Sequence, residues 1–331
     1  METISAGVLK IDARAVSHEI ESSIRDSVLN RLRRRGAVVG ISGGVDSSVT
    51  AAICAKALGS EHVFGILMPE QDSSPESLEL GRKLAEKFGI QYVVEDIAPT
   101  LQALGCYERR DNAIRKVIPE YGPGWKSKIV LPGVADGSKY SLFSVVAQSP
   151  DGKQKKVRLT TEAYLGIVAA TNFKQRTRKM LEYYHADRLW FAVAGTPNRL
   201  EYAQGFFVKN GDGSADFKPI AHLYKTQVYQ LGEYLGVPDE ILRRPPTTDT
   251  YSLEQSQEEF YFSVPLETLD LCLFGRNNGM SVDEIANLAG LPVEQVRSVY
   301  DNIESKIRAS RYLHLPPQLV REVGEVKESV G

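Results

Sequence analysis

The stretch AVVGISGGVDSS at residues 37–48 decides the fold of this chain. Its first five residues form an apolar run that is typical of a buried strand, and residues 47–58 favour a helix. Adjacent glycines stand at the junction, so the chain is expected to turn sharply from strand to helix. Such a turn directs backbone N–H groups and the positive end of the helix dipole at one point, which predicts a binding site for an anion.

Polar side chains in the same turn sharpen this prediction. Ser42, Ser47 and Ser48 supply further donors, and Asp46 places a carboxylate where phosphate groups would gather. A carboxylate suits that position only if a metal ion bridges it to the phosphates. The turn is neither a Walker A loop nor a GxGxxG dinucleotide fingerprint. An ordinary strand–turn–helix junction is the alternative, and it leaves the aspartate flanked by hydroxyl groups unexplained.

Bulk composition limits the class of protein. The 331 residues are 42% hydrophobic and 25% charged, which is typical of a globular protein with a sizeable core, and we expect residues 1–331 to form one domain. The formal net charge of −2 gives no general attraction to nucleic acid or to an anionic membrane. The start of the chain carries no signal pattern and no long apolar run occurs, so a cytoplasmic protein is expected.

The rest of the chain predicts a doubly wound α/β fold. Strands are expected at 63–70, 91–97 and 190–195, with an amphipathic helix at 74–89 and a long helix at about 161–187 between them. Strand–helix–strand units of this length favour a mostly parallel, Rossmann-like sheet with helices on both faces. Ligands of such sheets bind at the carboxyl ends of the strands, so residues 42–48 and 67–74 should share one edge.

Two segments depart from this pattern. Residues 119–160 contain alternating runs around Ser-Pro-Asp-Gly-Lys, which predicts a β-hairpin insertion. The insertion is open to two interpretations, a lid or dimer flap and a decorative surface element. Residues 280–317 form a C-terminal helical segment with two helices around Gly290, and the charge balance argues against a DNA-binding role for it.

Further polar clusters follow the later elements. Arg176 and Arg178 are two residues apart, so on a helix one can face a phosphate and the other a second site or a subunit partner. A solvated basic helix face is the alternative. After the last strand, Glu201 is expected near the strand end, where it could join Asp46 as a magnesium ligand. The loop 209–219 is rich in glycine and acid, and Lys225 beyond it could stabilise a pyrophosphate leaving group.

These motifs together resemble a known family. The turn is similar to the pyrophosphate loop of N-type ATP pyrophosphatases, and the whole ordered set resembles the ammonia-dependent NAD synthetases. The resemblance covers about residues 15–118 and 165–317. Its motifs, in chain order, are SGGVDSS (42–48), MPE with following serines (68–74), NxxxRxR (172–178), GTxNxxE (195–201), KxGDGxADxxPI (209–220), LYKTQV (223–228) and PPTTD (245–249).

The resemblance implies a two-step ligase reaction. The nicotinate carboxylate of deamido-NAD attacks the α-phosphorus of ATP, pyrophosphate leaves with Mg²⁺, and ammonia then attacks the acyl-adenylate to give NAD and AMP. A carboxylate resists ammonia because it is an anion with a poor leaving group, and adenylation replaces that group with AMP. Catalysis of this kind depends mainly on positioning and on charge neutralisation.

Residue roles follow from the motif match. The resemblance implies catalytic roles for Asp46, Lys225 and Asp216, and magnesium ligation by Asp46 and Glu201. It implies ATP binding by Gly40, Ser42, Gly43, Gly44, Val45, Asp46, Ser47, Ser48, Met68, Arg176, Thr196, Lys225 and Thr248. It implies binding of deamido-NAD by Asn172, Arg178, Lys209, Asp212, Asp216 and Arg311.

The resemblance also implies partners. Members of the family are homodimers with the dinucleotide site at the subunit interface, so a homodimer is expected. Only 36 residues precede the strand of the glycine turn, so no glutaminase domain is expected there. Nitrogen would then come from free ammonia or from a separate glutaminase.

The chain departs from the family pattern on the acceptor side. Gln175 stands where the family has alanine, only Arg311 and His314 stand where a basic cluster is usual, and residues 260–262 replace an acidic-Leu-Gly ending. These departures, with the insertion, leave open a paralogue that adenylates a different carboxylate. An RNA-modifying pyrophosphatase and a non-catalytic nucleotide-binding regulator are further alternatives.

Overall fold

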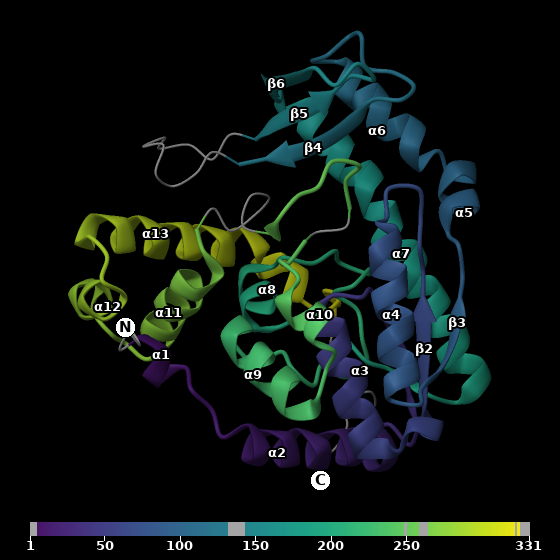
Figure 1. Ribbon diagram of the computed structural model, residues 1–331, viewed down its shortest axis with the longest axis vertical. Coiled ribbons are helices and arrows are strands. Elements are labelled where there is room, and N and C mark those ends of the chain that lie inside the picture. Colours follow the sequence, from purple (N-terminus) through teal and green to yellow (C-terminus); the bar gives the residue numbers. More distant parts are fainter. Residues whose placement is uncertain (1–4, 132–142, 248–249, 258–263, 322, 325–331) are drawn as a thin grey trace.

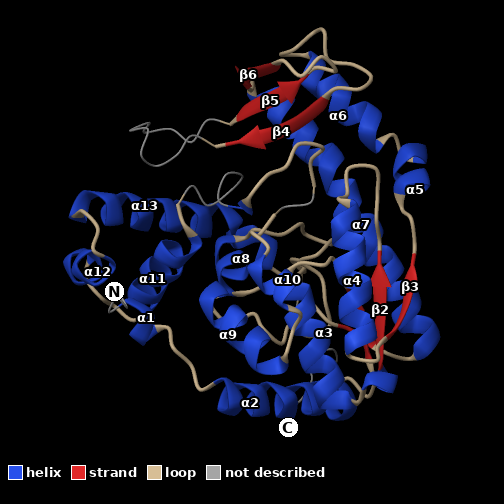
Figure 2. Cartoon of the chain, in the orientation of Figure 1, coloured by secondary structure: helices blue, strands red, loops and turns tan. Residues whose placement is uncertain are grey.

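A four-stranded parallel sheet forms the centre of the protein in the computed structural model (Figures 1 and 2). The structure describes residues 5–131, 143–247, 250–257, 264–321 and 323–324. The strand order is β3-β2-β1-β7, and every pair is parallel. The strands are β1 (Ala37–Gly40), β2 (Val63–Leu67), β3 (Gln91–Val94) and β7 (Ala192–Val193). The predicted doubly wound α/β class is therefore confirmed.

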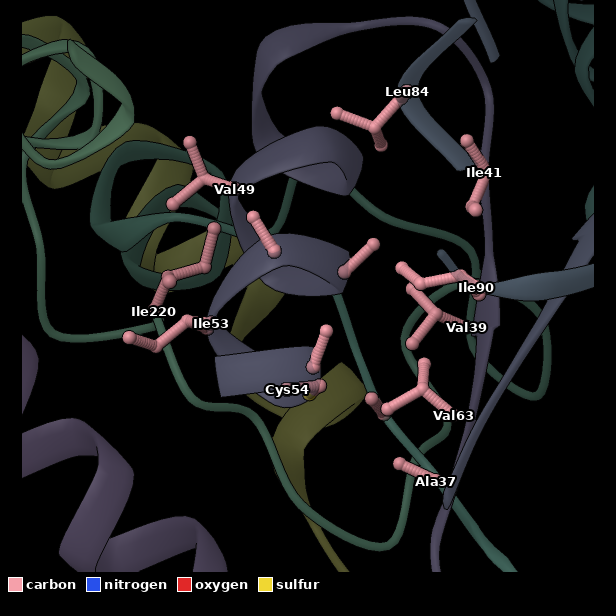
Figure 3. Close-up of a cluster of buried hydrophobic side chains, with 14 of the residues drawn as sticks. Ala37, Val39, Ile41, Val49, Ile53, Cys54, Val63, Leu84, Ile90 and Ile220 are labelled. Carbon is pink, nitrogen blue, oxygen red and sulfur yellow. The ribbon is translucent and has the colours of Figure 1, made fainter. Parts of the chain in front are cut away.

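Both faces of the sheet are covered, because successive side chains of a strand point to opposite sides. Val39 packs with the hydrophobic residues of α3 (Val45–Leu58) and α4 (Pro75–Lys87), as Figure 3 shows for part of this cluster. Its neighbour Val38 packs in a second cluster that includes Ala186 of the long helix α7 (Thr161–Leu189). This layering brings α3 and α7 to opposite faces of β1 and places the turn between β1 and α3 at the sheet edge.

The remaining helices frame this sheet. Near the start of the chain, a helix changes from α to π at Asp26. The other elements are α1 (Ser5–Val8), α2 (Ala13–Arg25), the π-helix Asp26–Arg31, a 3₁₀ turn (Ser60–His62), α5 (Ala98–Ala103), α6 (Cys106–Arg115), α8 (Arg199–Gln204), α9 (Lys225–Leu235) and α10 (Asp239–Arg243). No helix within the described ranges is both long and apolar enough to cross a membrane.

The insertion is a separate antiparallel sheet at the top of Figure 1. Its strands are β4 (Lys126–Val130), β5 (Ser144–Gln148) and β6 (Gln154–Arg158), in that order. The predicted hairpin is the β5–β6 pair, which is joined by a turn at Ser149–Lys153. Strand β4 was not predicted, because it is short and lies in a stretch rich in glycine, proline and lysine. Its strand conformation depends on pairing with β5.

The C-terminal helices pack as a separate group at the left of Figure 1. They are α11 (Leu266–Asn277), α12 (Val282–Ala289), α13 (Val293–Ser310) and a 3₁₀ turn (Arg311–His314). The helix pair expected around Gly290 is present, and Gly290 ends α12 in the left-handed conformation. Leu200 of α8 and Tyr224, which precedes α9, share their hydrophobic cluster, so this group is attached next to the edge of the parallel sheet.

Candidate active site

The glycine turn has a backbone that other residues cannot easily adopt. Gly43 has φ +77°, and a Cβ at this position would lie 2.3 Å from the carbonyl oxygen of Ser77. Gly44 is the N-cap of α3 and no side chain caps the helix there. The hydroxyl groups of Ser42 and Ser47 lie 3.0 Å apart, and Ser47 also donates to the Gly44 carbonyl at 3.0 Å. The turn is thus held by its own side chains, and the first residues of α3 line a cavity.

A cavity of about 420 Å³ opens at this edge of the sheet. The ends of β1 and β2, one face of α7 and the loops around α8 and after α10 form its walls. The predicted site residues that line it are Gly40, Ser42, Gly44, Val45, Asp46, Ser47, Met68, Asn172, Arg178, Thr196, Glu201, Asp212 and Lys225. Segments far apart in sequence therefore meet here, as the predicted topology requires.

An ion pair in the cavity joins the glycine turn to α9. The ammonium group of Lys225 donates to Asp46 Oδ2, and the side chain of Lys225 is buried. Asn198 donates from Nδ2 to the other oxygen, Asp46 Oδ1, at 2.9 Å. Asn198 also caps α8 by accepting from the N–H of Glu201, whose carboxylate accepts in return from the N–H of Asn198 at 3.2 Å. This capping box fixes Glu201 beside the Asp46–Lys225 pair.

The charges of this group shift one another's protonation. Burial and the nearby Asp46 carboxylate raise the pKa of Glu201. Burial lowers the pKa of Lys225, but the carboxylates of Asp46 and Glu201 outweigh it and raise that pKa to about 12. Lys225 is therefore a permanent positive charge in the cavity, whereas the carboxyl group of Glu201 resists ionisation beside the Asp46 carboxylate.

This carboxylate pair fits a magnesium ion. The described part of the chain contains no group of three or more metal-ligating side chains. Magnesium does not require one, because it is usually held by one or two carboxylates together with substrate phosphates. The raised pKa of Glu201 beside Asp46 marks a carboxylate pair that a bound cation would stabilise.

Sequence reasoning missed Asp270, which positions the lysine. Its carboxylate accepts from the N–H of Lys225 at 3.1 Å and from the N–H of Thr226 at 2.7 Å. An acid at this place satisfies the first donors of α9 and complements its dipole. Asp270 lies 45 residues further along the chain in a leucine-rich run, so no local signal identified it.

Other predicted residues lie outside the cavity wall. Gly43 and Ser48 are buried behind the turn, and Arg176, Lys209 and Arg311 are on the surface side of their elements. Asp216 accepts from the N–H of Val193 at 2.7 Å and from the hydroxyl of Tyr183, so it connects its loop to the edge strand β7. Thr248 and residues 260–262 lie outside the described residues.

The two arginines of NxxxRxR point in different directions, as expected. Arg178 lines the cavity and donates to the carbonyl oxygen of Met68 at 3.3 Å. Arg176 is exposed and donates to the carbonyl oxygen of Lys209 at 3.3 Å. Lys209 in turn donates to the carbonyl of Tyr312 at 3.0 Å. This exposed chain of contacts links the acidic loop to the turn that begins at Arg311.

A buried ion network beside the cavity was also missed. Lys174 is fully buried, and its ammonium group lies 2.9 Å from Glu70 and 2.7 Å from Asp72. Arg110 lies against the same Asp72, and Tyr107 donates to Glu70 at 2.8 Å. Lys174 lies within the NxxxRxR motif, but a lysine on a helix is usually solvated. Only the packing of α6 and α7 reveals its burial.

Fold and cavity together define the class: an α/β protein with a glycine turn and a carboxylate–lysine centre in a cavity at the sheet edge. A model of the NAD synthase family matches residues 16–118 and 146–312. The chain is 61% identical over 323 residues to the NH₃-dependent NAD⁺ synthetase of Rhizobium meliloti (strain 1021), covering 98% of this chain and 96% of that protein. It is 58% identical to the synthetase of the same name from Rhizobium rhizogenes (strain K84), over 97% and 96% of the two chains.

The chain belongs to the NAD synthase family, which confirms the predicted resemblance. Among solved structures, the NH₃-dependent NAD synthetase of Campylobacter jejuni has the same fold, with a TM-score of 0.62 at 21% identity over 94% of this chain and all of that one. The glutamine-dependent NAD⁺ synthetase of Acinetobacter baumannii has a TM-score of 0.51 at 18% identity, and the match covers 94% of this chain but 47% of that one. The family match leaves out residues 119–145, within the predicted insertion.

Proposed function

We propose that this protein amidates deamido-NAD to NAD with ammonia, consuming ATP and releasing AMP and pyrophosphate through an acyl-adenylate. Relatives at 57–61% identity over nearly the whole chain bear the name of ammonia-dependent NAD synthetases. The observation that carries the proposal is the contact of Lys225 with Asp46 at the glycine turn, inside a cavity large enough for a nucleotide.

The residues of the cavity suit the first step. The N–H groups at the start of α3 and the hydroxyl groups of Ser42 and Ser47 can bind ATP phosphates. The ammonium group of Lys225 is held by Asp46 at the point where pyrophosphate would leave, so it can stabilise the negative charge of the leaving group. Magnesium held by Asp46 and Glu201 would neutralise further phosphate charge when bound.

The remaining roles concern the acceptor acid. Asn172, Arg178 and Asp212 line the cavity and are proposed to contact deamido-NAD. Asp212 accepts from the N–H of Val208 at 2.8 Å, which fixes its loop, and burial raises the pKa of Asp212. Three predicted acceptor residues lie outside this cavity: Lys209, Asp216 and Arg311. They could contact the dinucleotide if it extended beyond the cavity, as in a site shared between two subunits.

A homodimer through α7 completes this proposal. Leu165, Met180 and Tyr184 are exposed by 57%, 58% and 59%, and they lie with Arg176 on one outward stripe of α7. A row of exposed apolar side chains on a long helix is typical of a protein interface. Asn172 lies one helical turn before Arg176 on α7, so a partner on the stripe would sit close to this proposed acceptor contact. Ammonia from a separate glutaminase and a cytoplasmic location stay predictions.

A product assay tests the proposed function. The protein is supplied with ATP, magnesium, ammonium and deamido-NAD, and NAD and AMP are measured together. The expected result is equimolar NAD and AMP that depends on all four components. Pyrophosphate released with another acid, but not with deamido-NAD, would instead indicate a paralogue. ATP binding without AMP under any acceptor would indicate a regulator.

A further inference from the structure

The inserted sheet makes direct contacts with the chain that closes one side of the cavity. The side chain of Ser252 accepts from the N–H of Ser127 at 2.9 Å, and the N–H of Leu253 donates to the Ser127 carbonyl at 3.2 Å. Gln255 donates from its side chain to the carbonyl of Ile129 in the same strand, β4. In Figure 1 the pale-green chain after α10 rises to this sheet. Residues 250–257, here named the docked segment, therefore lie along β4.

Hydrophobic packing strengthens the contact. Tyr251 of the docked segment is 7% exposed and belongs to a cluster with Ile129 of β4 and Val145 of β5. The same cluster includes Ile114 of α6 and Ile167 of α7, so the insertion is anchored to both helices. The insertion is thus packed against the cavity wall.

The start of the docked segment is held from the opposite side by a buried charge. Lys174 on α7 donates to the carbonyl oxygen of Thr250 at 2.7 Å. Its ammonium group is fixed by Glu70 and Asp72, which follow β2. A buried ammonium group with carboxylate partners has little freedom, because moving it would leave those charges unpaired. Thr250 is therefore fixed relative to the end of β2.

The end of the docked segment reaches the catalytic centre. Gln257 is 9% exposed, and its Nε2 donates to Glu201 Oε1 at 3.1 Å. The other oxygen of Glu201 accepts from the N–H of Asn198, so each carboxylate oxygen has one donor. The N–H of Gln257 donates to the Pro246 carbonyl at 3.1 Å, which fixes the backbone at this point. The orientation of Glu201 is thus set jointly by α8 and by the docked segment.

We propose that the inserted sheet positions the catalytic centre: β4 holds the docked segment so that Gln257 orients the carboxylate of Glu201. Gln257 is then a positioning residue, and the insertion contributes to the site by holding the docked segment in place. The aromatic pair Phe143–Tyr164, stacked with ring centroids 4.3 Å apart, adds a second contribution, because both rings line the cavity and Phe143 directly precedes β5. The inference rests on the proposed function only in treating Glu201 as part of the substrate site.

The test compares three variants by hydrogen–deuterium exchange on the free protein. Gln255→Met removes the donor to Ile129 at similar side-chain size, and Gln257→Met removes the donor to Glu201. Gln154→Met makes the same change on the exposed outer strand β6 and is the control. Gln255→Met should accelerate exchange in residues 250–257 and in α8 at least about fivefold, which corresponds to one lost hydrogen bond. Gln257→Met should accelerate exchange in α8 alone. The control Gln154→Met should change exchange in neither region.

Steady-state kinetics supply the second readout. Gln255→Met and Gln257→Met should lower kcat/KM for ATP at least about fivefold while the control stays at the wild-type value. The inference would be overturned if neither variant changed the exchange rate in α8. It would also be overturned if exchange rose equally in α8, β1 and β2, because that pattern indicates a general loss of stability. Exchange is measured without substrates, so this result does not depend on the proposed function. If the proposed function is wrong, the wild-type protein will form no NAD, whatever the exchange pattern.

Discussion

At the residue scale, the glycine turn shows that a sequence motif can be required by the backbone conformation. Gly43 lies in the left-handed region, and the space beside it is taken by the backbone of Ser77. Both the positive φ and the lack of space for a Cβ explain why glycine stands at this position. Either a side chain or a change of φ would move the N–H groups that face the cavity.

Gly43→Ala should therefore destabilise the protein and weaken ATP binding. The free energy of unfolding should fall by more than about 1 kcal/mol because of the backbone conformation alone. The steric clash of the new Cβ with Ser77 should lower it further. Gly236→Ala is the matched control, since Gly236 also has φ +77° but nothing within 4 Å of an added Cβ. Urea unfolding and ATP titration would measure both variants. Equal effects of the two changes would contradict a role for the crowding at Ser77.

The Asp46–Lys225 pair makes a second prediction at this scale. Asp46→Asn keeps the shape but removes the charge that holds Lys225 and the proposed magnesium. AMP formation should fall at least about 100-fold, while the circular dichroism spectrum stays that of the wild type. Asp239→Asn, on the exposed start of α10, is the control. Near-normal turnover of Asp46→Asn would remove both the metal assignment and the leaving-group role.

At the element scale, α9 depends on a cap supplied by another helix. Asp270 of α11 accepts from the first N–H groups of α9, and burial raises its pKa to about 6 from an ordinary value of 3.8. The folded protein therefore retains the proton of Asp270 between about pH 4 and 6, whereas the unfolded chain loses it. The stability from this group is complete below pH 4 and is lost as the pH rises through 6.

Asp270→Asn should remove this pH dependence. From pH 4 to pH 7 the wild type should lose at most about 3 kcal/mol through this residue, and the variant nothing. The difference in unfolding free energy between wild type and variant should accordingly shrink as the pH rises. Urea unfolding of both proteins at several pH values measures it. A difference that stays constant or grows with pH would contradict the raised pKa.

Element positions were predictable where the pattern is local. Residues 161–187 were expected to be helical and α7 spans Thr161–Leu189, because the run contains no proline and is rich in residues that favour helices. The edge strand β7 keeps only Ala192–Val193 of the predicted 190–195, since its pairing with β1 is short. Strand β4 and the burial of Lys174 depend on partners distant in sequence, so neither could be predicted.

At the scale of the whole molecule, subunit association is the main untested expectation. Met180→Glu places a charge on the exposed α7 stripe and should convert the proposed dimer into a monomer. Leu29→Glu, at a side chain that is 46% exposed on the π-helix, is the control. Sedimentation velocity would measure both, together with NAD formation. A monomeric wild type would exclude the homodimer, and a dimeric Met180→Glu variant would exclude α7 as its interface. A single domain over residues 1–331 likewise stays a prediction.

The sequence by itself determined the α/β class, the family, the strand–turn–helix junction at residues 37–48 and many of the residues that line the cavity, because each depends on a local pattern that a few neighbouring residues specify. The tertiary structure alone decided that Asp270 caps α9, that Lys174 is buried, and that the inserted sheet holds Gln257 against Glu201. These features need contacts between residues 45 to 126 positions apart. Such contacts arise from how the elements pack, and no local pattern encodes them.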